Sequence, residues 1–231
     1  DFDGASLRAA FGDGREADLL SGEERQQLLA KFAGLPFERR YTFDPDQRGP
    51  DVASDTVLVN SVAGGLGKGL LPGGKVRIFQ QTGDTEAFLG EDVATPTPLG
   101  EELVLHTGTA RDLVARRAQM DSRNDVIMRD RWGNTAMQNV VTTMRWEVEN
   151  FTGEPRTVRL VQRMPGEWDV VDAEQLLEKR IAPEKFEPAR FESNPAARVE
   201  REDAGTIVIH LPVPPNRRVV FTAGLRRLNV H

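Results

Sequence analysis

Apolar and polar residues alternate along several short stretches of this chain, and that alternation restricts it to a small set of folds. A period of two residues is typical of a β-strand with one buried face. The stretches at 207–213 and 219–225 alternate in this way. The clearest case is residues 140–150, whose apolar face consists of Val140, Met144, Trp146 and Val148.

Turns rich in Gly and Pro separate these stretches, and many short strands between such turns favour a sandwich or a distorted barrel. We predict an all-β fold, an antiparallel β-sandwich or two small sandwich lobes, with long loops and at most one or two short helices. Residues 140–163 are expected to form a hairpin that turns at 151–155. Within it, Glu147 and Glu149 would pair with Arg159 or Arg163 across the two strands.

The N-terminal region is ambiguous. Ser21 and Glu24 form a capping box, which favours a helix over residues 22–33, whereas the resemblance described below favours an extended strand there. Residues 1–36 are therefore assigned to an N-terminal segment, the end of a preceding β-rich region, and residues 37–231 to a sandwich module. Residues 173–200 are charged and contain prolines, and they predict a long excursion from the sheet with one helical piece at 173–180.

Residues 60–92 contain the most distinctive local pattern. Residues 75–81 have strand composition, residues 82–85 suit a turn, and residues 86–92 return, which predicts a β-hairpin. The glycines that precede this hairpin match neither a P-loop nor a dinucleotide fingerprint in their spacing. They nevertheless form the candidate binding surface that the sequence offers, namely Gly64, Gly65, Gly67, Lys68 and Gly69.

Charge and composition exclude several classes of function. The formal net charge is -6, which argues against broad nucleic-acid binding, since that requires a surplus of Lys and Arg. The arginine pairs at 116–117, 217–218 and 226–227 are attributed to solvated strand edges. The chain has no cysteine, so it has no disulfide, thiol nucleophile or zinc-thiolate site.

No apolar run is long enough to span a bilayer, and the start lacks the apolar region of a signal peptide. The chain begins with Asp1 rather than Met, which is typical either of a processed protein or of a sequence cut from a longer one. A targeting signal would then have been removed.

The chemistry-bearing residues do not form a recognisable catalytic set. His106 and His210 are interpreted as surface or satisfied histidines. The acidic stretch from Asp44 to Asp51 lacks the register of a calcium loop and predicts a solvated hairpin tip. The tripeptide at 150–152 has the form of a glycosylation sequon, to which we give little weight in so tight a turn. We assign no catalytic residues, no metal ligands and no cofactor.

Five stretches carry a family resemblance, and they occur in the family's order across most of residues 38–223. They are NSVAGGLGKGLLPGGKVRIF (60–79), AFLGED (87–92), LHTGTARDLVARR (105–117), WEVENFTGEPRTVRLVQRMPGEW (146–168) and IHLPVPP (209–215). In these stretches the chain resembles the C-terminal module of the bacterial family named domain of unknown function 4139. The resemblance implies an all-β module of exported bacterial proteins, located in the periplasm or cell envelope. It implies no reaction and no catalytic residues.

These observations favour a non-enzymatic binding or assembly module, with a protein partner or self-association at loops and edge strands. One alternative is a carbohydrate-active or other hydrolase module with acidic residues in a groove, for which Trp132 or Trp168 would form an aromatic platform. A second alternative is a structural half of a longer protein. A glycan ligand belongs to the first alternative, and nucleic acid belongs to none of them.

Overall fold

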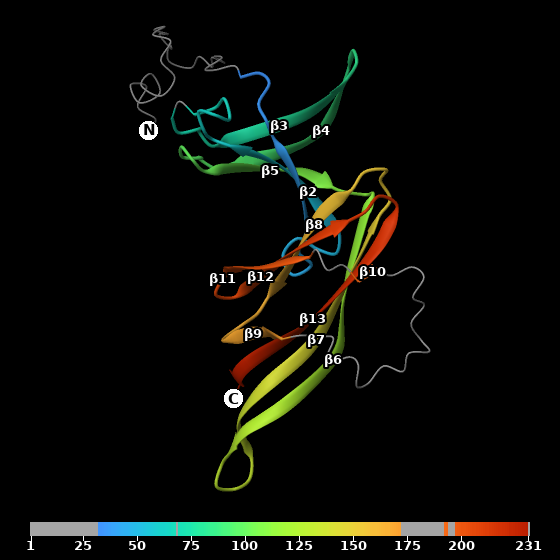
Figure 1. Cartoon of the computed structure of the whole chain (residues 1–231). Helices are drawn as coiled ribbons and strands as arrows, with labels where there is room; N and C mark the ends of the chain where they lie inside the picture. Colours follow the sequence, from blue (N-terminus) through green and yellow to red (C-terminus); the bar gives the residue numbers. More distant parts are fainter. Residues whose placement is uncertain (1–31, 68, 172–191, 194–196, 231) are drawn as a thin grey trace. The chain divides into compact units, whose positions relative to one another are not determined.

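The computed structural model describes residues 32–67, 69–171, 192–193 and 197–230 (Figure 1). The helix-or-strand question at 22–33 falls mostly outside these residues, as do Lys68 and the helical piece expected at 173–180. Every regular element in the described part is a β-strand, so the all-β prediction is confirmed. No sheet closes on itself, which favours the sandwich over the distorted barrel.

The chain divides into two compact units. Unit 1 consists of Asp1–Arg39 and Asp55–Gly108, and unit 2 of Arg40–Ser54 and Thr109–His231. The predicted boundary after residue 36 stays a prediction, because residues 1–31 lie outside the described part. The strands are β1 (Glu38–Phe43), β2 (Val52–Val59), β3 (Gly74–Thr82), β4 (Thr85–Ala94), β5 (Glu102–Thr109), β6 (Leu113–Arg129), β7 (Thr135–Asn150), β8 (Arg156–Arg163), β9 (Trp168–Val171), β10 (Glu192–Ser193), β11 (Arg198–Asp203), β12 (Thr206–Val213) and β13 (Arg217–Val230).

Three sheets account for these strands. The strand order is β11-β12-β8-β1-β2-β5 in the first sheet and β10-β13-β7-β6 in the second, where β9 also pairs with β13; β3 and β4 form the third. Most pairs are antiparallel, but β1 runs parallel to β8 and β10 runs parallel to β13.

Unit 2 is a β-sandwich. The alternating residues that the sequence assigned to the core come from both large sheets and meet in one buried cluster. Trp146 on β7 is fully buried, and its ring lies 6.0 Å from that of Phe221 on β13. On β12, the residues Ile207, Ile209, Leu211 and Val213 are each at most 1% exposed.

The predicted hairpin over residues 140–163 is wrong. β7 pairs with β6 and β13, whereas β8 pairs with β12 and β1, so residues 151–155 carry the chain from one sheet to the other. The expected pairing of Glu147 with Arg159 or Arg163 therefore does not form, because strands in different sheets are not cross-strand neighbours. Glu147 binds Arg218 on β13 and Arg116 on β6 instead.

The acidic turn between β1 and β2 is a turn, as predicted, but it is not simply solvated. Asp44 is buried, and its Oδ1 accepts a hydrogen bond of 2.6 Å from Arg163. Both Asp46 carboxylate oxygens accept hydrogen bonds from the Arg117 guanidinium, at 2.9 and 2.6 Å. The turn thus joins β6 and β8, one strand from each sheet of the sandwich.

β6 and β13 place the arginine pairs differently from the expectation. Arg116 and Arg117 lie on β6, which ends its sheet and fits an edge. The pairs at 217–218 and 226–227 lie on β13, which has strands on both sides. At 226–227 β13 lies between β7 and β9, so the interpretation of this pair as edge residues is wrong, and Arg226 is instead bonded to Asp169 on β9. In the described part of the chain, residues 217–218 pair with β7 on one side only, so for them the interpretation stays a prediction.

Candidate functional site

The segment that contains the candidate glycines, residues 61–69, lies in unit 1 between β2 and β3, and we call it the glycine loop. Its glycines are required by geometry, since Gly65 has a φ of +80° and a Cβ at Gly67 would lie 2.1 Å from the backbone nitrogen of Val62. A Cβ at Gly64 would lie 2.7 Å from the carbonyl oxygen of Val59. Gly69 has neither constraint. Packing within the loop therefore explains three of its four glycines.

The amide groups of this loop are already hydrogen-bonded within it. The Ser61 Oγ accepts from the Gly64 amide at 2.9 Å, and the Ser61 carbonyl accepts from the amides of Leu66 and Gly67. The Gly65 amide donates to Val62 at 3.1 Å. An anion site needs amides that point at the ligand. This loop instead uses them to hold its own conformation.

Asn60 fastens the loop to the rest of unit 1. Its side chain is fully buried, and its Nδ2 donates to the carbonyl oxygens of Gly69 (2.9 Å), Thr97 (2.9 Å) and Pro98 (3.1 Å). These carbonyls come from the two ends of the segment that contains the β3–β4 hairpin. One amide therefore fixes the base from which that hairpin extends.

The β3–β4 hairpin forms where the sequence predicted it, with its turn at residues 83 and 84. A β-bulge makes Leu89 the unpaired extra residue between Phe88 and Gly90. The two phenylalanine rings, Phe79 and Phe88, pack edge to face at 5.4 Å between centroids. Both remain half exposed, at 50% and 58%.

The hairpin carries four exposed apolar side chains. In addition to the two phenylalanines, Leu89 is 41% and Val93 70% exposed. In the part of the chain that the structure describes, β3 and β4 pair only with each other, so neither outer edge of the hairpin has a strand partner. The Asp92 carboxylate on β4 accepts from the His106 amide of β5 at 2.7 Å. Such a combination of apolar surface and unpaired backbone is the physical requirement for strand addition.

Glu91 binds both cations of the hairpin. Glu91 accepts from Lys75 at 2.8 Å and from Arg77 at 3.2 Å. Hydrogen bonds from Lys75 and Arg77 hold the pKa of Glu91 below its usual value. The carboxylate therefore stays ionised and keeps both cations on the hairpin.

His106 and Asp55 form a pair on neighbouring strands of unit 1. The His106 Nδ1 lies 3.0 Å from the Oδ1 of Asp55, which is buried, while the imidazole is half exposed. A carboxylate that orients a histidine occurs in catalytic triads. In the described residues no hydroxyl group is hydrogen-bonded to this ring, so the pair links β5 to β2.

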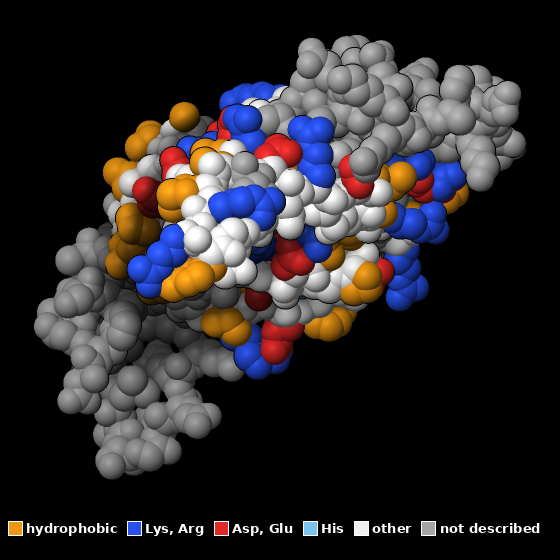
Figure 2. Space-filling model, turned by 90° about the horizontal axis from the view of Figure 1, so that it is seen from below, with side chains coloured by type: hydrophobic (Ala, Val, Ile, Leu, Met, Phe, Trp, Pro, Cys, Tyr) orange, Lys and Arg blue, Asp and Glu red, His pale blue; other side chains and the backbone are white. Residues whose placement is uncertain are grey.

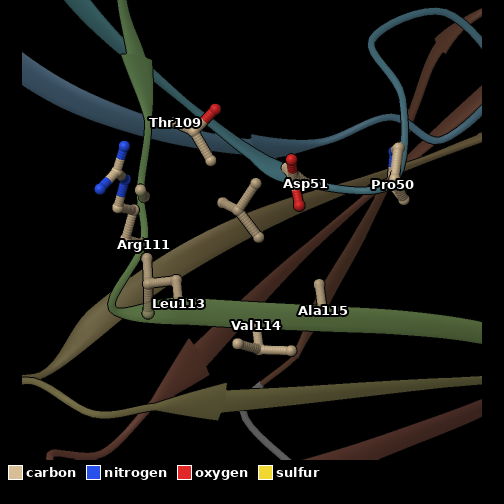
Figure 3. Close-up of a pocket in the computed structure, with 9 residues that line it drawn as sticks. Pro50, Asp51, Thr109, Arg111, Leu113, Val114 and Ala115 are labelled. Carbon is tan, nitrogen blue, oxygen red and sulfur yellow. The ribbon is translucent and has the colours of Figure 1, made fainter.

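Unit 2 contains a cavity of ≈ 380 Å³ (Figure 3). Asp51 supplies its single carboxylate and Arg111 its single guanidinium. Glycoside hydrolysis ordinarily needs two carboxylates across the scissile bond. The full lining is Pro50, Asp51, Val52, Thr109, Ala110, Arg111, Leu113, Val114 and Ala115.

Neither tryptophan that the hydrolase alternative requires lies at this cavity. Trp168 is buried, its Nε1 donates to the Ala204 carbonyl at 2.6 Å, and the Arg201 guanidinium lies 3.9 Å from its ring centroid. Trp132 is exposed in the turn between β6 and β7. His210 lies 3.6 Å from Glu200, and no cluster of three metal-ligating side chains occurs among the described residues.

Fold and surface together define an all-β protein with one well-packed sandwich and a second unit that presents an exposed apolar hairpin. Comparison with protein-family models, curated proteins and solved structures found no match. Within the described residues, no helix has the length and hydrophobicity needed to cross a membrane.

Proposed function

We propose that this chain is a non-enzymatic binding and assembly module of an exported or envelope protein of a bacterium, and that its β3–β4 hairpin binds an extended strand of another protein. The observation that carries the proposal is the hairpin itself, with two edges that lack a strand partner in the described residues and half-exposed Phe79 and Phe88. The bacterial and envelope assignments rest on the family resemblance of the sequence. Sequence alone favoured the neighbouring glycine loop as the binding surface.

The contrast with β11 supports the hairpin as a binding edge. β11 ends its sheet and has the sequence RVERED, whose charges discourage pairing with another chain. β3 has the sequence GKVRIFQQT, without proline, and its two cations are bound to Glu91. One edge of this protein is therefore protected against strand addition, and the other is open to it.

An added strand would stabilise unit 1, because the apolar core of this unit is small. Four apolar side chains are buried among its described residues, namely Val57, Leu66, Ala94 and Leu105. A two-stranded hairpin is marginally stable on its own, and a third strand supplies both hydrogen bonds and apolar contacts. We assign that strand to a different protein, because pairing between identical copies at two open edges would continue into a filament.

The test begins with a photo-crosslinking amino acid in place of Phe88, and a control in place of Leu99. Leu99 is 57% exposed in the same unit but lies outside the hairpin. After crosslinking in a bacterial envelope extract, mass spectrometry identifies the attached segment, which is then synthesised as a peptide. The peptide is expected to slow amide exchange in β3 or β4 and to bind the Phe79→Ser/Phe88→Ser variant at least about tenfold more weakly.

Three results contradict the proposal. Crosslinks from position 99 that equal those from position 88 would remove the hairpin as the site. The hairpin would also be excluded as the site if the peptide bound the wild type and the Phe79→Ser/Phe88→Ser variant equally, or if it bound without slowing amide exchange in β3 and β4. Filaments or a stable oligomer of the purified chain in light scattering would show that the hairpin pairs with copies of itself.

A further inference from the structure

The turn between β6 and β7 in unit 2 exposes a second set of large apolar side chains. Ile127, Met128 and Trp132 are 52%, 50% and 71% exposed. We call residues 127–134 the hairpin tip. It lies at the far end of the β6–β7 hairpin from the crossover at 151–155 (Figure 1).

The hairpin tip has a fixed conformation. The Asp130 Oδ1 accepts from the amides of Trp132 (2.9 Å) and Asn134 (2.8 Å), and its Oδ2 accepts from the Asn134 side chain. Gly133 has a φ of +89°, and its carbonyl accepts from Arg129 at 2.9 Å. Trp132 is thus presented to solvent from a rigid turn.

The charge on the hairpin tip is positive. It contains two arginines, Arg129 and Arg131, and one carboxylate, that of Asp130. The Arg131 guanidinium lies 4.0 Å from the Trp132 ring centroid. Burial raises the pKa of Asp130, but hydrogen bonds from Asn134 and Trp132 outweigh it and lower that pKa. The carboxylate therefore stays ionised and accepts hydrogen bonds within the turn. Charges are screened beyond about 8–10 Å at physiological ionic strength, so this local excess acts despite the net charge of -6.

We propose that the hairpin tip binds the surface of a phospholipid bilayer that contains anionic lipids. Trp132 would lie among the headgroups, Ile127 and Met128 would enter the acyl boundary, and the two arginines would pair with lipid phosphates. Figure 2 views the structure from below Figure 1, and on this face apolar and basic side chains lie next to one another. A convex turn fits a deformable interface, whereas a folded protein would need a matching pocket.

The tryptophans of this chain make the test direct. Trp146 and Trp168 are 0% and 6% exposed, so Trp132 gives the solvent-sensitive part of the fluorescence. Vesicles of phosphatidylcholine with phosphatidylglycerol are expected to shift the emission to shorter wavelength and to sediment with the protein. Brominated lipids should quench the signal. Trp132→Ser should weaken binding at least about tenfold and Arg131→Gln about fivefold.

Two further variants serve as controls. Phe151→Ser removes a side chain that is 55% exposed at the other end of the hairpin, and it should bind vesicles like the wild type. The Phe79→Ser/Phe88→Ser variant should do so too, which separates this proposal from that for the β3–β4 hairpin. Absence of vesicle binding, equal binding by Trp132→Ser, or equal binding to pure phosphatidylcholine would overturn the proposal.

Discussion

Two buried asparagines hold the irregular parts of this protein in the same way. Asn150 ends β7, and its Nδ2 donates to the carbonyl oxygens of Glu154 (2.8 Å), Val213 (3.2 Å) and Pro214 (3.2 Å). Asn60 makes an equivalent set of three bonds in unit 1. Each residue gives a buried side-chain donor to backbone carbonyls from separate segments, and in unit 1 two of these carbonyls, those of Thr97 and Pro98, also accept from backbone amides.

The position of Asn150 also settles the sequon at 150–152. Its side chain is fully buried, and its amide nitrogen, the atom to which a glycan would be attached, is engaged in the crossover between the sheets. A glycan at this nitrogen is incompatible with the folded structure.

The pair of Asp46 and Arg117 predicts a pH dependence of stability. The Arg117 hydrogen bond lowers the pKa of Asp46 from 3.8, against a smaller opposing effect of burial. A lowered folded-state pKa adds stability above the unfolded value and loses it as the pH falls. We expect Asp46→Asn to cost about 1 kcal/mol of unfolding free energy at pH 7, since the pair is partly exposed, and progressively less as the pH falls below the unfolded-state value of 3.8.

Urea unfolding at pH 7, 5 and 3 measures this difference. Asp125→Asn is the control, because its contact with Arg123 is exposed and 3.8 Å long. A cost at Asp46 that does not diminish in acid would mean that the residue acts through its shape.

The glycine loop allows a matched comparison at the level of an element. Gly67→Ala places a Cβ within 2.1 Å of the Val62 backbone, whereas nothing lies within 4 Å of a Cβ at Gly69. We expect Gly67→Ala to destabilise unit 1 by about 1–3 kcal/mol and Gly69→Ala to change it by less than about 0.5 kcal/mol. Chemical denaturation monitored by amide exchange in β3 and β4 measures both.

Equal effects at the two positions would contradict the loop geometry. The comparison also bears on function. If the loop binds a ligand, Gly69→Ala should leave the stability of unit 1 unchanged and lower the affinity for that ligand.

Alternation of side chains identified strands well but not their partners. The β3–β4 hairpin was predictable because a short turn determines which strands are adjacent. The link from β7 to β8, residues 151–155, is also short, yet it leads into the other sheet, and Asn150 at its start bonds to the carbonyls of residues 213 and 214. The sequence predicts a short strand at 113–118, whereas β6 continues to Arg129, because its distal half is largely exposed and gives no apolar period.

The candidate surfaces were predictable only in part. The sequence predicts a turn at 132–134 at the end of a polar segment, residues 122–134, and so gives no indication that Ile127 and Met128 form an exposed apolar surface beside it. The exposure of Phe79 and Phe88 could not be predicted, since the same strand composition would suit a buried hairpin.

At the scale of the whole molecule, the two units should differ in local stability. The sandwich core of unit 2 takes side chains from both large sheets, whereas the described part of unit 1 buries four apolar side chains. Amides of β3 and β4 are therefore expected to exchange at least about a hundredfold faster than those of β7 and β12. Hydrogen exchange with mass spectrometry at pH 7 gives both rates. Equal protection would mean that both units open in one cooperative step.

The position of β13 has a consequence for synthesis. β13 pairs with β7 over most of its length, but it leaves the ribosome tens of residues after β7 does. Because the ribosome adds about 5–20 residues per second, one edge of β7 and its apolar face stay without their partner strand for several seconds. During that interval the nascent chain exposes an unpaired strand to which chaperones can bind.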